Sequence, residues 1–82
     1  MSMGKRIEKR RKQLGLTQED LASALKMRQA AISRLEHDGV PNPGAEMLKR
    51  LALALHCSID WLVGLYDDDT FTMQPRREPV SA

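Results

Sequence analysis

Four residues between positions 29 and 34 carry side chains that are suited to reading the edges of base pairs. They fall together when the segment is drawn on a helical wheel: Gln29, Ala30, Ser33 and Arg34. In a major groove an arginine pairs with guanine, an amide pairs with adenine, and a small methyl group packs against the methyl of thymine. Ile32 and Leu35 lie on the opposite side of the wheel. The pattern predicts a helix that buries one face and offers the other to double-stranded DNA.

The segment in front of this helix must position it. Residues 17–36, TQEDLASALKMRQAAISRLE, open with a helix start at Thr17, and Asp20 completes a pattern that resembles a capping box. Helical character stops near Lys26 and resumes at Arg28. Helices of about eight residues are unstable alone, because nucleation costs more than a few hydrogen bonds return. A break between two such helices is useful only if the second one must point in a set direction.

The remaining residues predict further helices and a tail. Apolar spacing and capping residues predict helices at about residues 3–14, 18–25, 28–37, 44–55 and 59–63. No stretch alternates with the period of two that a half-buried strand requires. We therefore predict an all-α fold of five short helices, with one domain over residues 3–65 and a flexible C-terminal tail over residues 66–82.

Positive charge is concentrated at the front of the chain. Residues 1–34 hold nine Lys or Arg against three acidic residues, a net charge of +6, whereas residues 66–82 have a net charge of −2. This asymmetry favours a polyanionic partner for the front half, although a solvated, charged helix face gives the same count.

Catalytic and metal chemistry find no support in the sequence. Cys57 is the only cysteine and adjoins His56, and no spacing typical of a zinc site is present. No nucleophile–base pair, glycine-rich phosphate loop or pair of carboxylates suggests an active site. We expect no catalytic residue, no metal and no cofactor. The chain has no signal peptide and no run that could span a bilayer, which predicts a cytoplasmic protein.

The order of the motifs resembles the Cro/cI-type (XRE-like) helix-turn-helix family of phage and bacterial repressors. The segments GLTQEDLA, ISRLE and SIDWL carry the resemblance together with Asn42-Pro43, over about sixty residues. It implies a lambda-repressor-like DNA-binding domain with the helix-turn-helix at about residues 18–37. It also implies a sequence-specific transcriptional regulator, a repressor that binds a two-fold symmetric operator as a homodimer with its third helix in the major groove.

The resemblance implies a role for each matching residue. Base contacts fall to the four residues named at the outset. Phosphate contacts are assigned to Gln18, Arg28 and Arg11. Ala22 is the small residue that lets the second helix approach the third near Ile32. Glu36 matches an ion pair with Arg11 that occurs in some relatives, and the alternative for Arg11 is a solvated cation.

Three departures from the family pattern bear on stability and binding. Lys26 stands in the turn where the family usually has glycine, and a left-handed residue other than glycine costs ~1 kcal/mol. Arg28 replaces the usual Ser or Thr cap of the third helix, which costs a further ~1 kcal/mol. An arginine there can reach a phosphate instead. The loop HDGVPNP is slightly longer than usual and has no Lys or Arg, so its contact with the DNA backbone is weakened or falls to main-chain N–H groups.

Two further expectations concern partners. The apolar residues predicted to form the homodimer interface, next to the loop at residues 40–43, are Ile59, Trp61, Leu62 and Val63. The alternative for Trp61 is a place in the core. The alternative function is an antitoxin-type protein-interaction module that binds a partner protein and autoregulates its own promoter. The tail, with Phe71 and Met73, would then fold on that partner or otherwise remain a disordered end.

Overall fold

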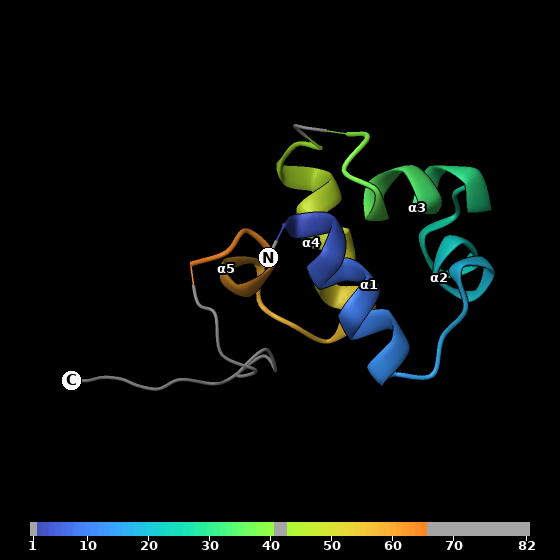
Figure 1. The fold of residues 1–82 in the computed structure, drawn as a ribbon, viewed down its shortest axis with the longest axis horizontal. Helices are drawn as coiled ribbons and strands as arrows, with labels where there is room; N and C mark the ends of the chain where they lie inside the picture. Colours follow the sequence, from blue (N-terminus) through green and yellow to red (C-terminus); the bar gives the residue numbers. More distant parts are fainter. Residues whose placement is uncertain (1, 41–42, 66–82) are drawn as a thin grey trace.

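Five helices build the part of the chain that the computed structural model describes, residues 2–40 and 43–65 (Figure 1). They are α1 (Met3–Gln13), α2 (Gln18–Leu25), α3 (Gln29–Glu36), α4 (Ala45–Leu55) and α5 (Ile59–Leu62). No strand occurs within these residues, so the predicted all-α fold of five short helices is confirmed. The predicted tail over residues 66–82 lies outside the described residues.

The helices pack around one small core. In Figure 1, α1 crosses in front of α4, the α2–α3 pair lies to one side of them, and α5 lies to the other. The helices α2 and α3 pack on each other. The helix α1 contacts α3, α4 and α5, and α4 also contacts α2 and α5. The core is aliphatic apart from one cysteine and one tryptophan: Ile7, Leu21, Ala22, Leu25, Ile32, Leu35, Leu51, Ala52, Leu55, Cys57, Trp61 and Leu62. Short amphipathic helices gain most of their stability from burial of this kind.

Every helix ends in the same way. A residue with positive φ follows each helix: Gly15, Lys26, Asp38, His56 and Gly64. The residue after each of them donates its backbone N–H to the carbonyl five residues earlier, as Met27 does to Ala22 at 2.8 Å. This is the Schellman arrangement, which satisfies carbonyls that the helix leaves open. Since glycine adopts positive φ at no steric cost, the three other residues carry strain at their helix ends.

Arginine side chains donate hydrogen bonds to further helix carbonyls inside the domain. Arg10 donates from Nε to the carbonyl of Leu55 at 2.8 Å and from Nη2 to that of His56 at 3.3 Å, at the end of α4. Arg50 donates to the carbonyl of Leu25, at the end of α2. A cation at a helix C-terminus also complements the helix dipole. These arginines therefore join helices that are distant in sequence.

Part of the positive charge near the N-terminus is carried by buried side chains. Arg6, Arg10 and Arg11 are buried, and the Arg6 guanidinium lies 5.3 Å from the centre of the Trp61 ring, in cation–π geometry. These three cations therefore contribute little to an exposed positive surface, although the sequence places them in the positively charged front half of the chain. Burial shows them to be part of the packing, where their stems cover apolar neighbours and their heads meet carbonyls, a carboxylate or a ring.

The start of α1 approaches the end of α3 closely. A Cβ on Gly4 would lie 2.4 Å from the carbonyl oxygen of Glu36 and 2.7 Å from Oδ1 of Asp38. The backbone N–H of Gly4 donates to that Oδ1 at 2.9 Å. Asp38 thereby satisfies an N–H that the first turn of a helix leaves open. Only glycine fits at this crossing.

Candidate nucleic-acid interface

The helix-turn-helix is formed by α2, the turn at Lys26 and α3. Thr17 caps α2: its hydroxyl accepts from the N–H of Asp20, and the Asp20 carboxylate accepts from the N–H of Thr17, both at 2.9 Å. The backbone N–H of Thr17, and then its hydroxyl, lower the pKa of Asp20. The predicted capping box is thus confirmed. Ala22 and Ile32 are both buried where the two helices pack.

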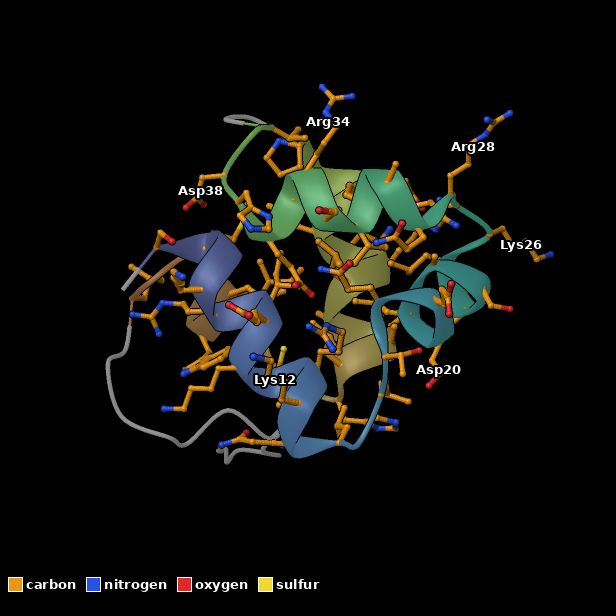
Figure 2. All side chains as sticks on the ribbon, turned by 45° about the vertical axis from the view of Figure 1, so that its right-hand side comes forward. Lys12, Asp20, Lys26, Arg28, Arg34 and Asp38 are labelled. Atoms are coloured by element: carbon orange, nitrogen blue, oxygen red, sulfur yellow. The ribbon has the colours of Figure 1, made fainter. Side chains whose placement is uncertain are left out.

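The turn between α2 and α3 places a residue other than glycine in the left-handed conformation. Lys26 has φ 56° and ψ 45°, in the left-handed region. Arg28 is the N-cap residue of α3 and its side chain makes no capping hydrogen bond. The left-handed turn residue and the missing side-chain cap that the sequence predicted are therefore both present. The exposed Lys26 and Arg28 side chains point outward at one end of α3 (Figure 2).

The outer face of α3 is open to solvent. Gln29, Ala30 and Arg34 are exposed, and Ser33 is half-buried. Figure 2 shows Arg28 and Arg34 projecting from α3 to the same side, away from the body of the domain. The opposite face of α3 buries Ile32 and Leu35. The structure thus brings the four residues predicted to read bases onto one helix whose inner side is fixed in the core.

An ion pair lies beneath this helix. Arg11 donates from Nε to Oε2 of Glu36 at 2.6 Å and from Nη2 to Oε1 of Glu36 at 3.2 Å. The Glu36 side chain is only 2% exposed. The hydrogen bond with Glu36 is the main cause of the raised pKa of Arg11, whereas burial acts in the opposite direction. The pair that the resemblance implied between the first and third helices is therefore present.

Two glutamine amides continue from this ion pair to the surface. Gln18 donates from Nε2 to Oε1 of Glu36 at 2.9 Å. Gln29 donates from Nε2 to Oε1 of Gln18 at 2.5 Å. The chain Arg11–Glu36–Gln18–Gln29, called the amide relay below, joins the buried ion pair to an exposed residue. Sequence reasoning missed this connection, although the place of both glutamines at the first position of adjacent helices was a signal for it.

An open hollow lies at the start of α2. Its lining residues are Arg11, Leu16, Thr17, Gln18, Glu19 and Gln29. The N-terminal turn of a helix presents unpaired N–H groups and favours an anion. Gln18 is half-buried there, so its assignment to a phosphate stays a prediction with suitable geometry. Arg11 differs, because its guanidinium faces Glu36 and the carbonyl of Leu16, at 2.8 Å from Nη1. A phosphate contact by Arg11 is less suited to this arrangement.

The predicted dimer residues separate in the structure. Trp61 and Leu62 are buried in the core, Ile59 is half-buried, and Val63 is 48% exposed. The placement of Trp61 and Leu62 on a dimer surface is therefore wrong for this domain, and the alternative, a core tryptophan, is what the structure has. The helix α5 ends at Leu62, so Val63 turns away from the core. The loop expected beside this interface includes Pro41 and Asn42, which lie outside the described residues.

The remaining reactive groups are placed as structural residues. Cys57 is fully buried, and burial raises the pKa of its thiol to about 11. Within residues 2–40 and 43–65, no three His, Cys, Asp or Glu side chains gather as metal ligands would. In the same residues no helix has the length and apolar character that crossing a membrane requires. The tail residues Phe71 and Met73, to which a protein partner was assigned, lie outside the described part of the chain.

The chain is similar to known regulators over most of its length. The family described as "Helix-turn-helix" matches residues 7–62. The HTH-type transcriptional regulator DicA of Escherichia coli (strain K12) is 36% identical over 81 residues, which cover 99% of this chain and 58% of DicA. The P22 c2 repressor, solved in complex with synthetic operator 9T in the presence of Tl+, is 38% identical with a TM-score of 0.72. That match covers 78% of this chain and 96% of the repressor chain.

Proposed function

Since this chain belongs to the Cro/cI-type helix-turn-helix family, we propose that it is a transcriptional repressor that binds double-stranded operator DNA with α3 in the major groove. We assign this activity to residues 3–65. In this proposal α3 reads base edges through Gln29, Ala30, Ser33 and Arg34. Gln18 and Arg28, near the N-termini of α2 and α3, grip the phosphates on either side of the groove.

One observation carries the proposal. The outer face of α3 presents an amide, a methyl group and a guanidinium to solvent, while its inner face is locked into the core. A major groove admits a helix of this kind, and these three groups match adenine, thymine and guanine respectively. The similarity to the P22 c2 repressor, which was solved in complex with a synthetic operator, supports operator DNA as the partner of this chain.

We further propose that two copies bind together. A single helix makes few base contacts, and helix-turn-helix proteins usually double them by two-fold symmetry on half-sites about 10 bp apart. Val63 and Leu65, which are 48% and 68% exposed, follow the short helix α5 and are large apolar side chains in contact with water. We assign the interface to these two residues and the half-buried Ile59. Burial of such a patch would stabilise a dimer.

Binding to selected DNA tests the proposal. The protein is used to enrich duplexes from a random pool, and affinities are then measured for the enriched duplex and for a scrambled duplex of equal composition at one fixed salt concentration. We expect an affinity ratio of 10³ or more, which is typical of specific operators. Equal affinity for the two duplexes would show that the chain does not read sequence.

Sedimentation on a duplex with two half-sites tests the dimer. We expect two copies per duplex and cooperative binding, both weakened by Val63→Glu and Leu65→Glu. Leu53→Glu is the matched control, since Leu53 is an equally exposed leucine on the outside of α4. A protein that stays monomeric both free and on this duplex would contradict the dimer while leaving DNA binding intact.

A further inference from the structure

We propose that a hollow between α3 and α4 binds a small aromatic carboxylate, with the ring inside the hollow and the carboxylate on Arg34, and that this ligand releases the protein from DNA. The site follows from the residues that line the hollow. Its effect on DNA rests on the proposed function, in which Arg34 reads a base.

The α3–α4 hollow has a volume of about 120 Å³. Its apolar lining residues come from the turn after α2, from α3, from the chain between α3 and α4, and from α4: Met27, Ala31, Leu35, Val40, Pro43 and Met47. An apolar cavity of ~150 Å³ engineered into another protein takes up benzene. A hollow of this size therefore suits one aromatic ring and is too small for a helix or strand of a partner protein.

The walls of the hollow are able to adapt to a flat ring. Met27, Val40 and Met47 are only partly buried and pack against the core. Methionine is unbranched and polarisable, and its sulfur makes favourable contacts with the edges of aromatic rings. Ala31 has a short side chain and leaves the space on the α3 side that the ring needs. These walls favour an aromatic ring over a branched aliphatic group.

Arg34 determines the charge of the ligand. It is exposed, it lines the hollow together with the six apolar residues, and no acidic residue of the described chain lines the hollow with it. A guanidinium binds a carboxylate through two parallel N–H···O bonds. The Arg34 side chain extends from α3 into solvent (Figure 2), which places the carboxylate at the mouth of the hollow. A charge at the mouth stays hydrated, so burial of the ring does not require burial of an ion.

The ligand and DNA compete for the same guanidinium. Arg34 is assigned to a guanine, and a guanine and a carboxylate both require its forked N–H groups. A bound carboxylate therefore removes one base contact per half-site. By linkage, the ligand lowers the affinity for DNA by the same factor by which DNA lowers the affinity for the ligand. The ligand would act as an inducer.

Methyl NMR of the free protein locates the ligand. The probe is benzoate, benzyl alcohol is a neutral ring of similar size, and acetate is a carboxylate without a ring. We expect saturable shifts of the Met27, Ala31 and Met47 methyl signals with benzoate. Benzyl alcohol should bind about two- to fivefold more weakly, the scale of one exposed ion pair, and acetate should give no saturable shift.

Two outcomes of this titration would overturn the site. The first is that benzoate gives no saturable shift, or no more than acetate gives. The second is that the methyl shifts follow the protein concentration instead of the benzoate concentration, because a second copy of the chain would then occupy the hollow.

Three variants, each shown to be folded by circular dichroism, separate the ring from the charge. Arg34→Met keeps a long apolar side chain but removes the guanidinium, so benzoate should bind no better than benzyl alcohol. Ala31→Leu fills the hollow and should abolish binding of both ring compounds. Lys49→Met is the matched control, since Lys49 is an exposed cation of α4 that does not line the hollow, and it should keep the wild-type affinity for benzoate. An Arg34→Met variant that still prefers benzoate would overturn the role of Arg34.

Competition with DNA tests the release. The affinity for the selected duplex is measured with and without saturating benzoate, with acetate at equal ionic strength as the reference for the effect of salt. We expect benzoate to weaken binding roughly tenfold per half-site, the scale of one lost base pairing, in the wild type but not in Ala31→Leu. Benzoate binding without a loss of DNA affinity would overturn the release. A protein that takes up benzoate but reads no sequence would overturn the proposed function, and the release with it, while the binding site stands.

Discussion

The backbone N–H of Gly4 donates to Oδ1 of Asp38 at 2.9 Å, so the first turn of α1 is tied to the left-handed residue that follows α3. Gly4→Ala would place a methyl group 2.4 Å from the Glu36 carbonyl oxygen, which is backbone and has little room to move. We expect a loss of ~1–3 kcal/mol in the free energy of unfolding, measured with urea. Lys5→Ala, one residue further along the same helix but exposed, should change it by less than ~0.5 kcal/mol. Equal stabilities of the two variants would show that α1 shifts away at no cost.

The same contact predicts a dependence of stability on pH. The hydrogen bond with the Ser2 side chain, and then that with the Gly4 N–H, lower the pKa of Asp38. The folded protein therefore binds fewer protons here than the unfolded chain. The stabilisation is present above the unfolded pKa of about 4 and is lost as the pH falls through the lower folded value. Asp38→Asn, which also tolerates positive φ, should flatten the loss of stability as the pH falls below about 4. Ser2→Ala should flatten it in part, and unchanged slopes in both variants would contradict this account.

Lys26 offers a stabilising change. It holds φ 56° in the turn of the helix-turn-helix, with its N–H bonded to the carbonyl of Ser23 at 3.1 Å. Lys26→Gly should raise the free energy of unfolding by ~1 kcal/mol, because glycine has no Cβ to strain. Lys26→Ala removes the same charge but keeps the Cβ, so it should give no gain. Thermal and urea unfolding measure both, and equal gains from the two variants would trace the effect to charge rather than to backbone strain.

The helices were predictable because their signals are local. Apolar spacing, the Thr17 cap and the glycines that follow α1 and α5 all act within one or two turns of chain. The hydrogen-bond partners of the buried arginines could not be predicted from local signals. The carbonyl that Arg10 meets belongs to Leu55, 45 residues later. A signal did exist, since Arg10 and Arg11 fill the turn that is missing from the apolar stripe between Ile7 and Leu14. The sequence shows two charges there, and only the packing of α4 and α3 on α1 shows their partners.

The candidate site divides in the same way. Which residues lie on the outer face of α3 follows from the helical period, so the set of Gln29, Ala30, Ser33 and Arg34 could be predicted. The amide relay depends on how α2 crosses α3 and on a buried carboxylate beneath both, which no single helix reveals. Val63 also shows the limit of periodicity. The spacing predicted a helix through residue 63, but α5 has only four residues and ends at Leu62.

The ion pair between Arg11 and Glu36 predicts non-additive stability changes. Both side chains are largely buried, and removal of one partner leaves the other as an uncompensated charge. Glu36→Ala should therefore cost ~3 kcal/mol or more, whereas Arg11→Met with Glu36→Leu should cost less than the sum of the single changes. A double-mutant cycle in urea measures the coupling. Additive losses would mean that the pair contributes no more than two independent side chains.

The two exposed arginines of α3 should differ in their response to salt and to sequence. Arg28 occupies the N-cap position of α3 and is assigned to a phosphate. Arg28→Ala should therefore weaken binding to all duplexes alike and reduce the salt slope by about one. Arg34 is assigned to a base. Arg34→Ala should relax discrimination by ~1–3 kcal/mol at one position per half-site. Gln18→Ala removes a neutral donor and serves as the control with little change in slope. Single-base operator variants titrated at three salt concentrations test this, and a uniform loss for Arg34→Ala would move that residue to the phosphate class.

The burial of the α1 arginines gives this domain a set of enclosed guanidinium groups that differs chemically from its exposed ones. Arg28 and Arg34 stand in solvent, whereas Arg6, Arg10 and Arg11 are enclosed by the helices that they join. A dicarbonyl reagent, which condenses with guanidinium groups that it can reach, should label the exposed population of the folded domain long before the enclosed one. Protection of Arg28 and Arg34 by bound DNA would then map the contact face on unmodified protein. Labelling at Arg10 would report the moment at which the domain opens.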